Sequence, residues 1–228
     1  AITPLPPFLP TNFRTPIYPF WLFFIYLIFK SFTPAIFIGA AVFALSAPLV
    51  YLIGKQIFSE KIAFISALIF AVEPWALFQS GFLAAEQIFL PIFLLSIYLF
   101  CLYLKYGKIQ HLYLASAILG VATLTRPVTL FFIAILVFLV FISELKISFW
   151  RSLKISTLTF LLFIAVLSPW LIRNKFVLNT WQFSSASGIS ILNEYFMLER
   201  YLGRIGPKED IYEKAKQLTG ANNDIEAI

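Results

Sequence analysis

Long apolar runs without a charged residue constrain the fold of this chain more than any other feature of its sequence. The clearest run, 87–104, approaches the roughly 20 residues with which an α-helix crosses the hydrocarbon core of a bilayer. Comparable runs are found at 34–53, 62–78, 109–125, 127–143 and 155–172. Because Glu73 and Pro74 interrupt the run 62–78, the pattern predicts five or six spans. We therefore predict an all-α fold, a polytopic transmembrane helical bundle.

The composition excludes a soluble domain. Charged residues make up 12% of the chain and hydrophobic residues 61%, whereas soluble domains carry about 25% charged residues. The net charge of +6 does not indicate a nucleic-acid partner, because basic residues of membrane proteins gather at cytoplasmic loops and lipid headgroups. A single Cys and a single His exclude an intrachain disulfide and a metal site built from Cys and His.

Changes in composition divide the chain into three parts. Residues 1–33 contain an aromatic run, 20–29, that is too short to cross a bilayer, and we predict an outer-face loop with an interfacial helix. Residues 34–173 form the predicted bundle. Residues 174–228 are predicted to begin a soluble outer-face region, with an amphipathic helix at 209–218. Because the chain begins without Met and stops within a polar pattern, we expect a fragment that lacks both ends of a longer protein.

The charges of the connecting loops alternate along the chain. One set of loops holds the basic residues Lys55, Lys61, Lys105, Lys108, Lys146, Arg151 and Lys154. The opposite set consists of the segment 73–86, which has no Lys or Arg, and the short turn 125–127. The positive-inside rule places the first set in the cytoplasm. The second set, together with residues 1–33 and the chain from Arg173 onward, is predicted to face outside.

Glu86 stands at the start of the run 87–104 on the predicted outer face. A carboxylate at the mouth of a membrane helix is costly, and is therefore a candidate functional group. An interfacial Glu that only marks the helix end is an equally good interpretation of its position.

Arg126 lies in the turn between two runs and is thereby held near the membrane. Its guanidinium can bind phosphate oxygens in a bidentate manner, which indicates an anion site. The alternative is a helix-end Arg that extends to the headgroups, since Pro127 is a favourable first residue for the next helix. The polar residues of the outer face predicted to bind substrate are Arg14, Tyr18, Glu86, Arg126, Arg173 and Asn174.

Five short motifs occur in one order along the chain. They are RTPIYP at 14–19, LIGKQIF at 52–58, the segment 74–89 with Ser80, Gly81, Glu86 and Phe89, GVATLTRP at 120–127, and PWLIRN at 169–174. Together they resemble motifs of bacterial glycosyltransferase family 39-like proteins, which are relatives of protein O-mannosyltransferases and of aminoarabinose transferases. The resemblance extends over nearly the whole chain up to about residue 193.

The resemblance implies a GT-C fold and an active site at the outer face of a membrane bundle. It implies inverting transfer of a sugar from a polyprenyl-phosphate donor to a hydroxyl-bearing acceptor, which is a lipid, a glycan or a protein. In such a reaction Glu86 would bind a sugar hydroxyl or hold an arginine in place. The general base of such a family is an Asp or Glu after the first span, and we expect that residue to lie before Ala1. No cofactor is predicted with certainty, and the use of a divalent metal ion is left open. The implied location is the inner membrane of a bacterium.

Two other classes of protein remain as alternatives. A transporter or flippase of lipid-linked sugars would also place charges within the membrane, but it would show discontinuous helices or inverted repeats. A membrane assembly subunit without catalytic activity would show no gathering of polar residues on one face.

Overall fold

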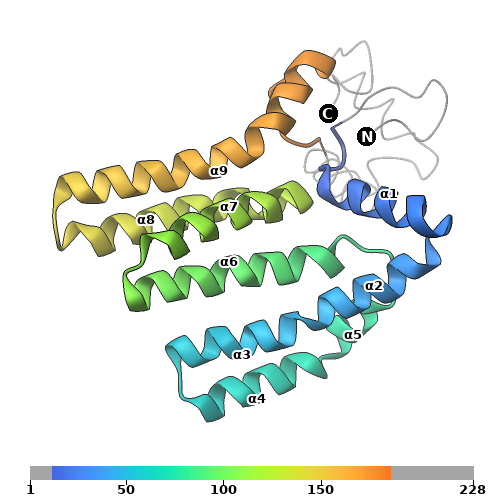
Figure 1. Ribbon diagram of the computed structural model, residues 1–228, viewed down its shortest axis with the longest axis horizontal. Coiled ribbons are helices and arrows are strands. Elements are labelled where there is room, and N and C mark those ends of the chain that lie inside the picture. The colour runs from blue at the N-terminus through green and yellow to red at the C-terminus, as the bar shows by residue number, and fades with distance from the viewer. Residues whose placement is uncertain (1–11, 186–228) are drawn as a thin grey trace, which may run out of the picture. The chain divides into compact units, whose positions relative to one another are not determined.

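The computed structural model describes residues 12–185, and this part of the chain is helical and contains no strand. The all-α prediction is therefore confirmed for the described residues (Figure 1). The chain forms two compact units, one of residues 15–173 and one of residues 1–14 with 174–228. Residues 1–11 of the predicted outer-face loop and the predicted helix at 209–218 lie outside the described residues.

The helices follow one another with short connections. Their bounds are α1 Ile17–Phe29, α2 Thr33–Ala44, α3 Ser46–Ile57, α4 Glu60–Ala71, α5 Pro74–Ser80, α6 Glu86–Tyr106, α7 Ile109–Thr125, the 3-10 helix η1 Pro127–Phe131, α8 Phe132–Leu145 and α9 Phe149–Leu178.

Four helical segments of the described residues are long and apolar enough to cross a membrane: Thr33–Ile57, Glu86–Tyr106, Pro127–Leu145 and Phe149–Leu178. The pair α4 and α5 makes a fifth if it is one span, although it is bent by 54°. Helix α7 is apolar but has only 17 residues, so at 1.5 Å per residue it is shorter than the roughly 30 Å hydrocarbon core. The chain is thus an integral membrane protein with a polytopic helical bundle.

The bend between α4 and α5 lies where Glu73 and Pro74 interrupt the apolar pattern. Pro74 is the first residue of α5, a position at which its missing N–H costs nothing. The Glu73 carboxylate accepts a hydrogen bond of 2.5 Å from the backbone N–H of Ala76 and so caps the new helix. Glu73 therefore has a structural role in the described structure.

Helix α9 extends beyond the predicted last span, 155–172, which contains Pro169 and Trp170 near its end. The helix continues through Pro169 to Leu178, so Arg173 and Asn174 are helical residues and not the start of a loop. A proline in a helix leaves the carbonyl four residues earlier without its N–H donor. Here the Ser168 hydroxyl donates to the Ala165 carbonyl at 2.9 Å, which satisfies that acceptor.

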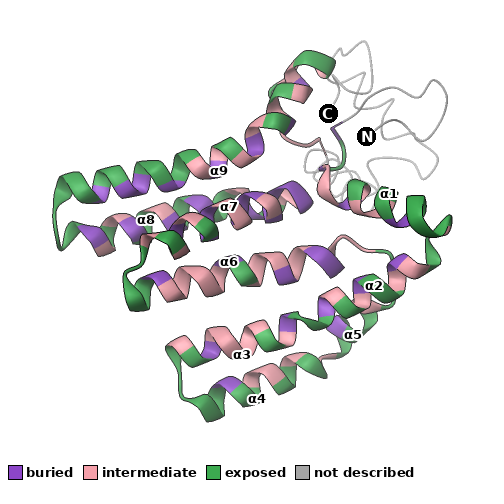
Figure 2. Ribbon diagram, viewed as in Figure 1, coloured by how far each residue is buried: buried purple, intermediate pink, exposed green. Residues whose placement is uncertain are grey.

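Helix α7 contributes much of the bundle's buried core (Figure 2). Small residues along it allow close approach of α9. A Cβ atom added to Gly120 would lie 2.8 Å from Cβ of Val166, so only glycine fits between the two backbones. The Ser116 hydroxyl, also on α7, donates to the Thr159 carbonyl of α9 at 2.6 Å. Small residues and interhelical hydrogen bonds of this kind are typical of packing between membrane helices.

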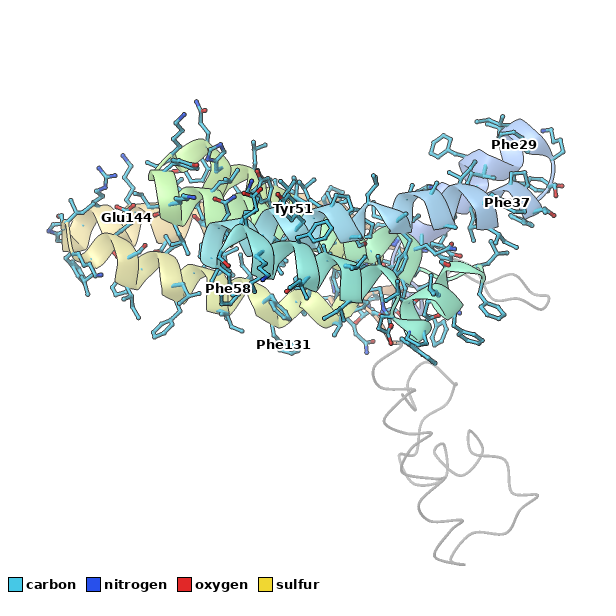
Figure 3. All side chains as sticks on the ribbon, turned by 90° about the horizontal axis from the view of Figure 1, so that it is seen from below. Phe29, Phe37, Tyr51, Phe58, Phe131 and Glu144 are labelled. Carbon is cyan, nitrogen blue, oxygen red and sulfur yellow. The ribbon has the colours of Figure 1, made fainter. Side chains whose placement is uncertain are left out.

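Three hairpin turns, α3–α4, α6–α7 and α8–α9, share one end of the bundle of residues 15–173 (Figure 1). Lys105 at the end of α6 donates to Gln56 of α3 at 3.1 Å. Glu144 of α8 accepts hydrogen bonds from Tyr103 of α6 at 2.6 Å and from Arg151 of α9 at 2.7 Å. Figure 3 shows Glu144 at this end and Phe37 at the other. We call this the basic end, because its turns carry the lysines and Arg151.

Candidate functional site

Arg126 connects α7 to η1 through an extended backbone, with φ −144° and ψ 127°. A residue that precedes proline is restricted to this region, so Pro127 ends α7 at Thr125 and turns the chain. The backbone N–H of Arg126 still donates to the carbonyl of Ala122 at 2.9 Å. The guanidinium is therefore attached to a short and well-supported turn.

The side chain of Arg126 forms an ion pair with Glu86, the first residue of α6 and 40 positions earlier in the chain. Its guanidinium also lies over the ring of Phe89, 5.9 Å from the ring centroid. Glu86 and Phe89 are three residues apart and thus face the same side of α6. A carboxylate in the first turn of a helix interacts favourably with the helix dipole, which favours Glu86 at this position.

This ion pair is accessible to a ligand from outside the bundle. The side chain of Arg126 is 41% exposed and that of Glu86 31% exposed. Glu86 engages one terminal nitrogen of the guanidinium, Nη1, and a guanidinium has five N–H donors in all. The arrangement therefore allows Arg126 to bind an anion while Glu86 holds its side chain in one orientation.

Gln87 fastens the segment that leads into α6. Its side chain is fully buried, and its amide donates to the carbonyl of Ser80, the last residue of α5, at 2.7 Å. The connection from α5 to α6 is thereby closed next to Glu86. Glu86 lies at the opposite end of α6 from Lys105, so the ion pair and the basic end are separated by about 30 Å of helix.

The structure brings Glu86 and Arg126 together and places the other predicted site residues as follows. Tyr18 is buried on α1 and stacks on Trp21. Arg173 lies on α9 with its guanidinium 4.9 Å from the ring centroid of Trp170.

Arg14 and Asn174 belong to the other compact unit. The guanidinium of Arg14 lies 5.7 Å from the ring centroid of Phe13. Asn174 is fully buried, and its amide donates to the carbonyl of Gln182 at 3.0 Å. These contacts give Asn174 a structural part within its own unit.

Two threonines next to Arg126 were not among the predicted site residues. The Thr15 hydroxyl donates to the carbonyl of Thr125 at 2.9 Å, and the Thr129 hydroxyl donates to the carbonyl of Arg126 at 3.3 Å. Thr15 belongs to the motif RTPIYP and Thr125 to GVATLTRP, so the structure joins two motifs that are far apart in sequence. Thr15 adjoins Arg14, which was already singled out, and this position is the signal that could have identified it. Thr129 is flanked by Val128 and Leu130 and carries no such signal.

Two cavities of the described residues lie away from the ion pair. A groove of about 530 Å³ runs between α8 and α9, and a cavity of about 140 Å³ lies among α2, α3, α4 and α5. Neither is lined by Glu86 or Arg126. Within residues 12–185, no group of three or more His, Cys, Asp or Glu side chains could hold a metal ion.

Comparison with known proteins identifies one family. Residues 14–172 match the sequence profile described as dolichyl-phosphate-mannose-protein mannosyltransferase. The match includes the motifs that contain Thr15, Glu86 and Arg126. Comparisons with curated proteins and with solved structures give no significant match.

Proposed function

Since the chain belongs to the dolichyl-phosphate-mannose-protein mannosyltransferase family, we propose that it transfers a sugar from a polyprenyl-phosphate donor to a hydroxyl-bearing acceptor. The family match covers more than half of the 228 residues and implies a membrane glycosyltransferase of the GT-C type. The observation that carries the proposal is the partly exposed Arg126, held by Glu86 at the end of the bundle opposite the basic turns.

The proposed reaction is a single displacement that inverts the configuration of the sugar. The acceptor oxygen forms a bond to the anomeric carbon while the bond between that carbon and the phosphate oxygen breaks. The electron pair leaves with the polyprenyl phosphate, and the hydroxyl proton passes to a general base. Negative charge therefore grows on the phosphate in the transition state.

Arg126 is proposed to stabilise this growing charge. A preorganised cation close to the leaving phosphate lowers the barrier, because it binds the transition state more strongly than the ground state. Its planar guanidinium can contact two phosphate oxygens at once. Glu86 holds the guanidinium from α6, and we propose this holding role for it in place of sugar binding. We also propose that Tyr18, Arg173, Arg14 and Asn174 bind substrate. This proposal rests on the sequence motifs that contain them, RTPIYP and PWLIRN.

The charge distribution supports an orientation in the membrane. The turns with Lys55, Lys105 and Arg151 share one end of the bundle, and the positive-inside rule favours the cytoplasm for it. The ion pair of Glu86 and Arg126 would then face outside. We propose this orientation, with residues 1–33 and 174–228 on the outer side of the 34–173 bundle. Location in a bacterial inner membrane is a proposal from the family resemblance.

Substitution of Arg126 in the full-length protein tests the proposed function. Membranes would be supplied with dolichyl-phosphate mannose carrying radiolabelled mannose, and both mannose transfer and release of dolichyl phosphate would be measured per amount of folded protein. Arg126→Ala should lower the transfer rate by about 100- to 1,000-fold, which is the typical effect of losing one transition-state contact. Arg126→Lys keeps the charge without the planar fork and should also lose most activity.

Arg151→Lys is the matched control. Arg151 also pairs with a carboxylate, that of Glu144, but it does so at the basic end. Its replacement by Lys should leave the transfer rate per folded protein near that of the unchanged protein. Full activity of Arg126→Ala would contradict the phosphate-binding role. Movement of the donor across the membrane without release of dolichyl phosphate would instead indicate a flippase.

A further inference from the structure

We infer that the hydroxyl of Thr15 positions Arg126 for its contact with the substrate phosphate, acting through the carbonyl of Thr125. This inference rests on the proposed function, because it takes Arg126 as the phosphate-binding residue. Thr15 does not touch the substrate in this scheme. It is a positioning residue contributed by the segment that leads into α1.

The peptide unit between Thr125 and Arg126 is held on both of its edges. On one edge the N–H of Arg126 donates to the Ala122 carbonyl at 2.9 Å. On the other edge the carbonyl of Thr125 accepts from the Thr15 hydroxyl at 2.9 Å, across 110 positions of sequence. Because a peptide unit is planar and rigid, two bonds on opposite edges fix its orientation. That orientation sets the direction in which the chain leaves α7.

The peptide unit on the other side of Arg126 is held as well. The carbonyl of Arg126 accepts from the Thr129 hydroxyl at 3.3 Å. That hydroxyl also lies 3.0 Å from the hydroxyl of Thr123, which donates its one proton to the carbonyl of Leu119 within α7. The single proton of Thr129 is therefore shared between Thr123 and the carbonyl of Arg126. These hydrogen bonds and the following Pro127 together restrict the backbone of Arg126, and they thereby restrict the direction in which its side chain leaves the chain.

The hydrogen bond from the Thr15 hydroxyl to the Thr125 carbonyl is buried, so a water molecule cannot easily replace the hydroxyl as donor. Thr15 is 4% exposed and Thr125 is 3% exposed. The carbonyl of Thr125 belongs to the last turn of α7, where carbonyls have no intrahelical donor. Loss of the Thr15 hydroxyl would leave a buried acceptor without a partner, and the peptide unit would rotate toward another donor. Arg126 would rotate with it, although its charge would be unchanged.

The side chain and the backbone of Arg126 are thus held from three different segments of the chain. Glu86 on α6 holds the guanidinium, whereas Thr15 before α1 and Thr129 in η1 hold the backbone. A displacement of about 1 Å at a reacting group can lower a rate by about 100-fold. We therefore expect that loss of the Thr15 hydroxyl lowers the rate of the chemical step and leaves the affinity for the donor nearly unchanged.

The test compares Thr15→Val with Thr15→Ser in the full-length protein. Valine keeps the shape of threonine and removes the hydroxyl, whereas serine keeps the hydroxyl. Thr15→Val should lower kcat for mannose transfer by about 10- to 100-fold with KM for dolichyl-phosphate mannose within about threefold of the original. Thr15→Ser should restore kcat to within about threefold. In an Arg126→Ala background, Thr15→Val should cause no further loss.

Ser116→Ala is the matched control, because it also removes a buried hydroxyl that donates to a backbone carbonyl of another helix. It should destabilise the fold without a comparable fall in kcat per folded protein. If Thr15→Val does not accumulate, Thr15→Ala replaces it in the same comparison.

Two outcomes separate this inference from the proposed function. A Thr15 variant without the hydroxyl that keeps kcat, beside an inactive Arg126→Ala, would overturn the positioning role and leave the function standing. Full activity of Arg126→Ala would overturn both. A fall in kcat that serine does not rescue would show that the hydroxyl is not the group responsible.

Discussion

The side chain of Gln87 on α6 fills the space that the absent side chain of Gly39 leaves on α2. A Cβ atom added at Gly39 would meet Oε1 of Gln87 and would lie 2.7 Å from its Cδ. The same side chain donates to the Ser80 carbonyl at 2.7 Å. Gly39 therefore provides the room in which Gln87 can close the connection before Glu86.

Gly39→Ala should destabilise the protein by about 1–3 kcal/mol, because the new methyl group displaces a buried side chain that is hydrogen-bonded. Gln87→Ala should also destabilise it, through loss of the bond to Ser80. The double variant should be more stable than the sum of the two losses by at least about 0.5 kcal/mol, since Gln87→Ala removes the clash. Thermal unfolding in detergent measures all three variants. Strict additivity would show that the two residues do not share this space.

The contact of α7 with α9 predicts a second stability effect. Gly120→Ala would place Cβ 2.8 Å from Cβ of Val166, and neither atom can move without moving a backbone. The expected loss is about 1–3 kcal/mol. Gly81→Ala is the control, because its nearest neighbour is the Phe78 carbonyl oxygen at 3.5 Å. Equal unfolding temperatures for the two alanine variants would contradict the close packing of α7 against α9.

At the basic end, the charge of Glu144 should destabilise the folded protein when Arg151 is removed. Glu144 is buried and depends on Arg151 and Tyr103 as its donors. Arg151→Ala should lower the unfolding temperature, because a buried carboxylate loses its counter-charge. Adding Glu144→Gln should raise it again, since a neutral amide can still accept from Tyr103. A double variant less stable than Arg151→Ala alone would show that Glu144 has another partner.

Much of the helical framework could be predicted from apolar periodicity and from helix-ending residues. The run 109–125 corresponds to α7, and the break at Glu73 and Pro74 separates α4 from α5. The predicted end of the last span at residue 172 was wrong, because α9 continues to Leu178 and Ser168 compensates for the hydrogen bond that Pro169 cannot make. Sequence patterns show where a proline lies but not which hydroxyl replaces its N–H.

The site could be predicted only in part. Loop charges and motifs singled out Glu86 and Arg126, but their ion pair depends on how α6 packs beside α7. The contact between Thr15 and Thr125 depends on where the segment before α1 returns to the bundle. No periodicity along one helix contains that information, because it is a relation between segments that are far apart in sequence.

The orientation of the bundle leads to a labelling prediction. In a Cys101→Ala background, a cysteine at Leu83 should react with a membrane-impermeant thiol reagent added outside intact cells. A cysteine at Tyr106, beside the α6–α7 turn, should react only after the membrane is opened. Both side chains are exposed in the structure, at 43% and 58%. Labelling of position 106 from outside would reverse the proposed orientation.

The ion pair of Glu86 and Arg126 predicts how their substitutions combine. If Glu86 acts only by holding the guanidinium, Glu86→Ala should lower kcat by about 10- to 100-fold, less than Arg126→Ala, which removes the cation itself. The double variant should then be no slower than Arg126→Ala alone, because nothing is left for Glu86 to hold. If Glu86 instead binds a sugar hydroxyl, the fold-decrease in kcat caused by Glu86→Ala should multiply the decrease caused by Arg126→Ala. Glu86→Ala should then also raise KM for the donor. Transfer rates of the two single variants and the double variant, measured per folded protein with dolichyl-phosphate mannose, distinguish the two roles. Losses that multiply would reject the holding role and would make Glu86 a direct substrate contact.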